Sequence, residues 1–295
     1  MKIELIDSIP AANTLGENVL WDDAQSCLWW TDIEARQLLR HDPATQTTQR
    51  FEVPERLCSF ALTDHPDCIL AAFESGIALY WPQTALVQWL SRPLQHQAGL
   101  RLNDGRTDRQ GRFWVGAMVE DSGPARADLY RFDEGPGLVA QRGGIALSNG
   151  LCWSPDGRQM YFTDSMTRTI RRYAYDPRTG DMSGGKDFAI NKGPGGPDGA
   201  TVDAQGFVWS AQWGDGQVIR YAPNGTIDTI VEIPVSLPTC VGFGGANLDR
   251  LYVTTAQEGL DEDARKQQSQ AGDVFIFQTD VRGLCDARVR INANA

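Results

Sequence analysis

The chain has 295 residues, and its formal net charge of −11 argues against nucleic acid or an anionic membrane as a partner, because both are bound through clustered Lys and Arg. The sequence contains no apolar run of 18 residues, so we expect no transmembrane helix. The alternating N-terminal segment 1–7 lacks the apolar core of a signal peptide, and we therefore expect a cytoplasmic protein.

Short strand pairs recur six times along the chain. In each pair, an aromatic or β-branched strand is followed by a polar turn and a second alternating strand. The expected pairs are 28–32 with 37–43, 69–73 with 77–82, 113–117 with 128–133, 160–164 with 169–176, 208–212 with 217–223, and 251–255 with 272–277. The residues that mark one phase of this pattern are Trp29, Ile69, Trp114, Tyr161, Trp209 and Tyr252. Their intervals of 40, 45, 47, 48 and 43 residues indicate a structural repeat.

Further apolar strands, such as 59–62 and 199–202, complete a four-stranded unit around each pair. Six such units are typical of an all-β fold, a six-bladed β-propeller, in which ring closure buries both faces of every blade. We expect strand 3–6 to pair with the last blade and close the ring. No linker divides the chain, so we expect a single domain over residues 1–295. The insertion 259–271 suits a short helix or lid beside a pocket, and a solvated loop explains it equally well.

Four polar side chains share one phase of the repeat. Glu17 and Asn149 precede the aromatic marker of their units by 12 residues, and Asn103 and Asp198 precede theirs by 11. In a ring these side chains meet at the axis, where two carboxylates and two amide carbonyls favour a bound divalent cation. Oxygen ligands favour Ca, Mg or Mn, although Zn or Fe(II) can also occupy such a site.

Two alternatives bear on this axial site. Taken singly, Asn149-Gly150 and Asp198-Gly199 are typical of ordinary turns, and only their shared phase favours convergence. The three histidines, His41, His65 and His96, lie off this phase, which argues against a Ser-His-Asp or Cys-His nucleophile. With a metal and a carboxylate but no nucleophile, the residues favour metal-assisted hydrolysis by an activated water.

Six short motifs carry a resemblance to a known family. In chain order they are Leu-Gly-Glu at 15–17, Arg-Leu-Asn-Asp-Gly at 101–105, Leu-Ser-Asn-Gly-Leu at 147–151, Trp-Ser-Pro-Asp-Gly at 153–157, Tyr-Phe-Thr-Asp at 161–164 and Pro-Asp-Gly at 197–199. Over nearly its full length, the sequence resembles the SMP-30/gluconolactonase/regucalcin family. The resemblance implies a six-bladed propeller, with one divalent metal on its axis, that hydrolyses sugar lactones to aldonic acids.

The resemblance also implies metal ligands. Residue by residue, it makes Glu17, Asn149 and Asp198 the ligands of the cation. It further implies that Asp198 is the general base, or the group that orients the attacking water.

Substrate contacts are implied in the same way. Asn103 matches a residue beside the metal that contacts substrate, and Arg101 matches one that binds the lactone oxygens; a solvated surface charge is the alternative for Arg101. Where relatives often present a Glu after the third blade strand, we align Asp121 as a further substrate contact. Glu120 and Trp213 are additional candidates for the pocket wall, and Trp213 can equally pack within its blade.

These observations lead to a functional expectation with two alternatives. We expect metal-dependent hydrolysis of a pentono- or hexonolactone to its aldonic acid in sugar catabolism. A promiscuous esterase or organophosphate hydrolase would use the same axial metal, whereas a non-catalytic calcium-binding or scaffold propeller would carry out no chemistry. The expected partner is a small sugar lactone, and the expected state is a monomer or weak homo-oligomer.

Overall fold

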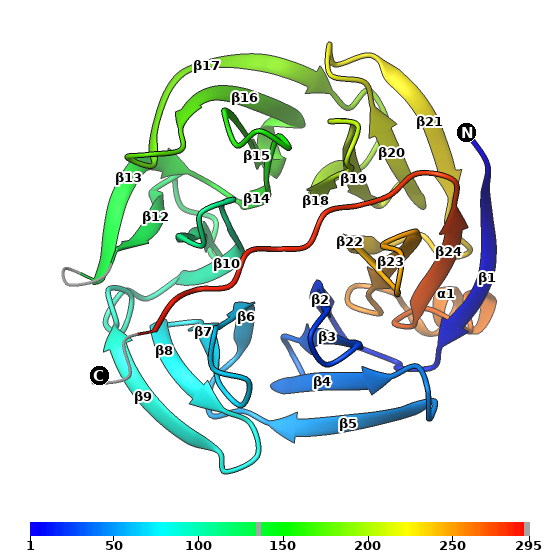
Figure 1. Cartoon of the computed structure of the whole chain (residues 1–295), viewed down its shortest axis with the longest axis horizontal. Coiled ribbons are helices and arrows are strands. Elements are labelled where there is room, and N and C mark those ends of the chain that lie inside the picture. The colour runs from blue at the N-terminus through cyan, green and yellow to red at the C-terminus, as the bar shows by residue number, and fades with distance from the viewer. Residues whose placement is uncertain (134–136, 292–295) are drawn as a thin grey trace.

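The computed structural model describes residues 1–133 and 137–291, which form six four-stranded antiparallel sheets arranged as a ring of blades (Figure 1). Blade 1 comprises β2 (Gly16–Asp22), β3 (Cys27–Asp32), β4 (Gln37–Asp42) and β5 (Thr47–Glu52). Blade 2 comprises β6 (Leu57–Leu62), β7 (Ile69–Phe73), β8 (Gly76–Trp81) and β9 (Leu86–Ser91). Blade 3 comprises β10 (Leu100–Thr107), β11 (Phe113–Val119), β12 (Ala127–Asp133) and β13 (Gly137–Ile145).

The second half of the ring repeats this layout. Blade 4 comprises β14 (Ser148–Trp153), β15 (Gln159–Asp164), β16 (Thr169–Asp176) and β17 (Asp181–Ile190). Blade 5 comprises β18 (Gly196–Val202), β19 (Val208–Trp213), β20 (Gln217–Tyr221) and β21 (Ile227–Glu232). Blade 6 comprises β22 (Pro238–Gly244), β23 (Arg250–Thr255), β24 (Val274–Thr279) and the N-terminal β1 (Ile3–Ile9). The predicted six-bladed propeller is confirmed.

Both ends of the chain contribute to blade 6. β1 pairs antiparallel with β24, from Ile3 opposite Thr279 to Ile9 opposite Val274, which confirms the predicted ring closure. Opening the ring between blades 6 and 1 would require breaking this pairing. The shared sheet therefore favours one domain over two.

Burial decreases from the axis outward within each blade. The first strand of a blade lies nearest the axis and the last lies outermost (Figure 1). Every residue of β14 is buried, whereas none of β5 is. Innermost strands of neighbouring blades contact one another, as β10 contacts β6 and β14. Side chains at equivalent positions of these strands are thus brought together around the axis.

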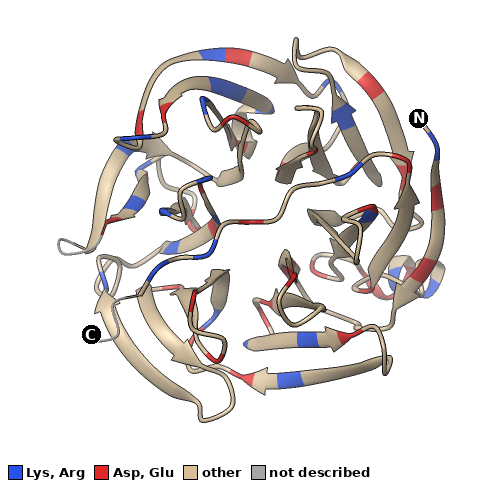
Figure 2. Cartoon of the chain, in the orientation of Figure 1, with Lys and Arg blue, Asp and Glu red and all other residues tan. Residues whose placement is uncertain are grey.

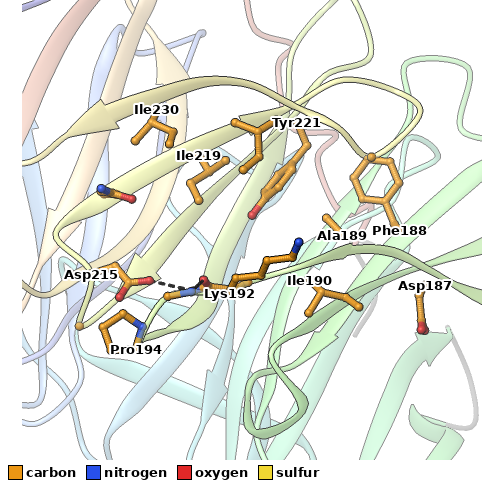
Figure 3. A pocket seen from close by; sticks show the side chains of 16 residues that line it. Asp187, Phe188, Ala189, Ile190, Lys192, Pro194, Asp215, Ile219, Tyr221 and Ile230 are labelled. Carbon is orange, nitrogen blue, oxygen red and sulfur yellow. Dashed lines mark hydrogen bonds between the residues drawn. The ribbon is translucent and has the colours of Figure 1, made fainter.

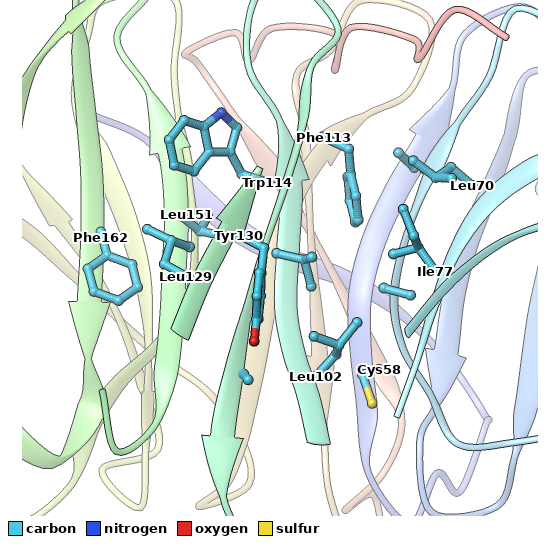
Figure 4. Packing of buried hydrophobic residues seen from close by; sticks show 14 of the residues in the cluster. Cys58, Leu70, Ile77, Leu102, Phe113, Trp114, Leu129, Tyr130, Leu151 and Phe162 are labelled. Carbon is cyan, nitrogen blue, oxygen red and sulfur yellow. The ribbon is translucent and has the colours of Figure 1, made fainter. Parts of the chain in front are cut away.

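Large aromatic side chains fill the spaces between blades. Figure 4 shows one such cluster, in which residues of blade 3 pack between those of blades 2 and 4. Trp114 is fully buried there, and its Nε1 donates to the Tyr175 hydroxyl at 3.1 Å, which in turn donates to Asp108 at 2.6 Å. Removing such side chains from water contributes most of the stability of the ring. All six cysteines are free thiols, and only Cys285 is exposed.

A C-terminal strap, residues 280–291, crosses the ring at the end where the innermost strands finish (Figure 1). The amide of Val289 donates to the carbonyl of Leu62 at 2.9 Å, and Arg106 pairs with Asp286 through contacts of 2.7 and 2.9 Å. Figure 2 shows both acidic and basic segments along the strap, and acidic and basic residues interspersed around all blades. The strap thereby covers one end of the central channel.

The insertion in blade 6 contains the short helix α1 (Glu262–Gln267), as one of its two interpretations predicted. Asp261 caps α1 by accepting from the amide of Ala264 at 2.8 Å. None of the residues of α1 is buried. Among the described residues, no helix is long and apolar enough to cross a membrane.

Candidate metal centre and its cavity

The predicted axial residues lie inside the innermost strands, and each stands at or beside a β-bulge. The strand register shifts between Glu17 and Leu20 in β2, and equivalent shifts occur in β10, β14 and β18. A bulge leaves one residue out of the strand ladder and redirects its side chain. Asn149-Gly150 and Asp198-Gly199 are therefore parts of bulged strands, and their interpretation as ordinary turns is wrong.

Gly199 illustrates why the bulge needs a glycine. A Cβ at this position would lie 2.7 Å from Sγ of Cys240 and 2.8 Å from its Cα, in the neighbouring blade. Only glycine allows the backbones of β18 and β22 to approach this closely. The close approach places Asp198 at the wall of the central channel.

A cavity of about 610 Å³ occupies the end of the channel where the innermost strands begin. Five of the six predicted site residues line it: Glu17, Arg101, Asn103, Asn149 and Asp198. The rest of its wall comes from loops and blade ends, namely Leu15, Ile33, Met118, Leu147, Ser165, Met166, Arg168, residues 194–197, Trp213, Glu258 and Gly259. The strap crosses the opposite end of the channel, so the cavity and the strap lie at different ends of the ring.

A chain of hydrogen bonds connects the polar residues of the cavity. Arg101 Nη1 donates to Asn103 Oδ1 at 2.6 Å, and Asn103 Nδ2 donates to Asn149 Oδ1 at 3.0 Å. Asn149 Nδ2 donates to the Ser165 hydroxyl at 2.8 Å, which donates to the carbonyl of Pro197 at 2.6 Å. The chain orients each amide, and a second lone pair on Asn149 Oδ1 stays available to a ligand.

The two axial carboxylates are buried without a counter-ion. Glu17 is 9% exposed and Asp198 is 7% exposed, and neither forms an ion pair within the described part of the chain. Burial and the nearby charges of Glu17 and Asp104 raise the pKa of Asp198 well above its usual range. Burial and the charge of Asp104 likewise raise the pKa of Glu17. A cation would relieve this repulsion and compensate for the burial.

The donor set contains two carboxylates and an amide oxygen. No group of three or more His, Cys, Asp or Glu side chains is placed to hold a metal within residues 1–133 and 137–291. Asn149 is therefore needed to complete a set of three oxygen donors with Glu17 and Asp198. Such a set suits a hard divalent cation.

The comparisons with known proteins agree with these motifs. Residues 15–257 match the model of the SMP-30/Gluconolactonase/LRE-like region. The chain belongs to this family.

Relatives within the family align over almost the whole chain. An L-arabinolactonase from Azospirillum brasilense is 38% identical, covering 94% of this chain and 92% of its own. A 6-deoxy-6-sulfogluconolactonase from Pseudomonas putida is 33% identical, covering 93% and 94%. The crystal structure of a calcium-binding regucalcin from Agrobacterium tumefaciens superimposes with a TM-score of 0.92 at 29% identity, covering 97% and 98%.

One of the six predicted site residues, Asp121, does not line the axial cavity. Asp121 is half-exposed and accepts from Arg126 at 2.7 and 2.9 Å and from the amide of Gly123 at 2.8 Å. It lies outside the cavity wall, so its alignment as a substrate contact needs correction. The preceding residue, Glu120, lies 3.3 Å from Arg101 Nε, because successive residues after β11 point in different directions.

The structure also identifies site residues that the motifs do not reveal. Met166 and Arg168 reach the cavity from the short 3₁₀ turn η1 (Ser165–Thr167), and Glu258 reaches it from the loop after β23. Asp104, inside the Arg-Leu-Asn-Asp-Gly motif, accepts from the amide of Leu151 at 2.9 Å and adds negative potential to the axis. For Trp213, the sequence allowed either a place in the pocket wall or packing within its blade. The structure shows that it lines the cavity.

A larger cavity, of about 760 Å³, lies away from the axis between β17 and the outer strands of blade 5 (Figure 3). Apolar side chains such as Phe188, Ile219 and Tyr221 form much of its wall, and none of the predicted site residues lines it. The axial cavity, which holds the unpaired carboxylates, is therefore the candidate functional site.

Proposed function

We propose that this protein hydrolyses a sugar lactone to its aldonic acid with the help of one divalent cation. The observation that carries the proposal is the meeting of two unpaired, buried carboxylates with the Arg101–Asn103 pair in one cavity. Membership in the family supports it, as do relatives that are named L-arabinolactonase and 6-deoxy-6-sulfogluconolactonase. Pentono- and hexonolactones are the proposed substrates.

Glu17, Asn149 and Asp198 would hold the cation. When bound, the cation supplies Lewis-acid polarisation of the lactone carbonyl and stabilises the negative charge that develops on its oxygen. Ca, Mg, Mn, Zn and Fe(II) all remain candidates on ligand chemistry.

Asp198 is the proposed general base. Its carboxylate accepts a proton from the water that attacks the carbonyl carbon, or it orients that water for attack. The bond between the carbonyl carbon and the ring oxygen then breaks, and the proton is delivered to the ring oxygen as it becomes a hydroxyl group. The products are one molecule of the hydroxy acid for each lactone and water consumed.

Arg101 and Asn103 would bind the substrate oxygens. The guanidinium group of Arg101 presents paired donors that match neighbouring hydroxyl or ring oxygens. Because this pair suits a polyhydroxylated ligand, it favours a sugar lactone over the apolar substrates of a promiscuous esterase or organophosphate hydrolase. A non-catalytic calcium-binding protein is the second candidate, favoured by the similarity to the calcium-binding regucalcin.

A hydrolysis assay separates these candidates. Proton release from a panel of pentono- and hexonolactones would be measured with metal-stripped protein, to which Ca, Mg, Mn, Zn or Fe(II) is returned singly. We expect metal-restored hydrolysis in the native protein and in Asp121→Asn, which alters an acid outside the cavity, and loss of hydrolysis in Asp198→Asn. If folded native protein accelerates no lactone with any of the five metals, the lactonase proposal fails and the calcium-binding candidate takes its place.

A further inference from the structure

Arg56 lies outside the axial cavity, in the loop between blades 1 and 2, and contacts carboxylates from three blades. Its Nη1 and Nη2 donate to the two carboxylate oxygens of Glu120 at 2.8 and 3.0 Å. Its Nε donates to Glu74 at 2.7 Å, and its Nη1 also lies 3.2 Å from Glu34. The side chain of Arg56 is only 19% exposed, so these contacts are shielded from water more than ordinary surface pairs are.

Glu120 connects Arg56 to Arg101. Its Oε1 accepts from Arg56 Nη1 and lies 3.3 Å from Arg101 Nε, so one oxygen faces both guanidinium groups. Arg101 Nη1 is held by the carbonyl of Leu102 at 3.0 Å and by Asn103 Oδ1 at 2.6 Å. The Nη1 edge of the Arg101 guanidinium is thereby occupied by hydrogen bonds, whereas its Nε faces Glu120 as an ion pair and forms no hydrogen bond within the described residues. Its Nη2 makes no hydrogen bond within the described residues and is the edge available to a ligand.

Arg56 is also the counter-charge of this carboxylate group. Without it, Glu34, Glu74 and Glu120 would repel one another, since Arg101 pairs with Glu120 only. Glu120 would then either move away from Arg101 or pair with it fully. In both cases the guanidinium plane of Arg101 would change, and Nη2 would leave the orientation that the present contacts impose.

We propose that Arg56 is a positioning residue for substrate: it holds Glu120, and Glu120 in turn orients the guanidinium group of Arg101 toward the oxygens of the lactone. Arg56 itself does not line the cavity and touches no reacting atom. This inference rests on the proposed lactonase function. It assigns Arg56 to substrate binding and leaves proton transfer at Asp198 unaffected.

Steady-state kinetics of Arg56→Ala, with the cation and lactone that serve the native protein best, tests the proposal. We expect KM to rise about tenfold, as when one charge-assisted hydrogen bond is weakened, and kcat to stay within about twofold. Arg56→Lys should give an intermediate KM, because an ammonium group keeps the charge but cannot form the forked contact. Arg126→Ala is the matched control. It removes the ion pair of Arg126 with Asp121 in the loop that also carries Glu120, but it does not contact Glu120, so its KM should equal that of the native protein.

An unchanged KM in Arg56→Ala, or a fall in kcat with constant KM, would overturn the inference while leaving the lactonase proposal intact. Titration calorimetry with a hexonolactam, in which nitrogen replaces the ring oxygen, provides a readout that does not depend on turnover. We expect Arg56→Ala to bind the lactam about tenfold more weakly than Arg126→Ala does. Equal affinities would overturn the inference, even if no lactone proved to be a substrate.

Discussion

Replacing Asp286 by Ala should weaken the C-terminal strap measurably. Arg106 projects from β10 and is only 6% exposed, and both of its hydrogen bonds to Asp286 are short, at 2.7 and 2.9 Å. Removing Asp286 would leave a buried guanidinium group with backbone partners such as the carbonyl of Ala200, at 2.7 Å. The strap would lose this charged contact with the ring and keep the ion pair of Arg288 with Asp22, at 2.6 Å.

The cost follows from the burial of the pair. Breaking a buried ion pair by deleting one partner destabilises a protein by about 3–5 kcal/mol, and the surviving contact with Ala200 points to the lower end, about 3 kcal/mol. Unfolding entropy is about 2.1 cal/mol/K per residue, which gives roughly 0.6 kcal/mol/K for a chain of 295 residues. The melting temperature should therefore fall by about 5 °C.

The effect should also depend on pH. Burial opposes ionisation of Asp286, but the charge and hydrogen bonds of Arg106, together with the charge of Arg109, outweigh it and lower its pKa. A lowered pKa means that the folded state binds fewer protons than the unfolded state, so the pair stabilises the fold above the unfolded pKa of about 3.9. This contribution is lost as the pH falls through the lowered pKa.

Thermal unfolding followed by circular dichroism would measure both effects. The matched control is Asp187→Asn, which alters an exposed pair with Arg171 at 3.4 Å and should shift the melting temperature by less than about 1 °C. We expect the difference between Asp286→Ala and native protein to be largest near pH 7 and to shrink in acid. A melting temperature within 1 °C of the control at pH 7 would refute the reasoning.

Three further predictions concern the axial site. Asp198→Asn should lower kcat for lactone hydrolysis by about 10²–10⁴-fold, the usual contribution of a general base, whereas Asp121→Asn should stay within twofold of native activity; equal rates would contradict the role of Asp198. A cation at 100 times its dissociation constant should stabilise native protein by about 2.7 kcal/mol, and Glu17→Gln should lose most of this gain in a melting experiment; the same gain in both would exclude Glu17 as a ligand. Gly199→Ala should destabilise the fold by about 1–3 kcal/mol in denaturant titration, because its Cβ would collide with Cys240; unaltered stability would mean that the neighbouring blades separate freely.

Much of the fold could be predicted because its signals are local. The period of the aromatic strands, the turns between them and the unpaired alternation of 3–6 all depend on residues close in sequence, and they predict six blades and their closure by β1. The shared position of Glu17, Asn149 and Asp198 within the repeat could also be recognised from the sequence. A repeat that closes into a ring brings equivalent positions to its axis, so this shared position predicts that the three side chains meet there.

Other features depended on contacts between distant segments. The bulges that direct Asp198 into the channel form only where two strands pair with a shifted register, and Asn149-Gly150 alone cannot be distinguished from a turn dipeptide. The strap carries no repeat signal, and its position depends on Asp286 meeting Arg106, 180 residues earlier in the chain.

The division between sequence and tertiary structure is clearest around Arg101. The family resemblance of its motif implied a place in the cavity, which the residue alone did not indicate. Asp121 and Glu120 are neighbours in a loop outside the repeat, so sequence alone could not decide which of them would face Arg101. The tertiary structure decides it through Arg56, which approaches from another blade and holds Glu120, while Arg126 holds Asp121 at the surface. Periodic burial is encoded locally, whereas the direction of a loop side chain depends on the charges that the closed ring places beside it.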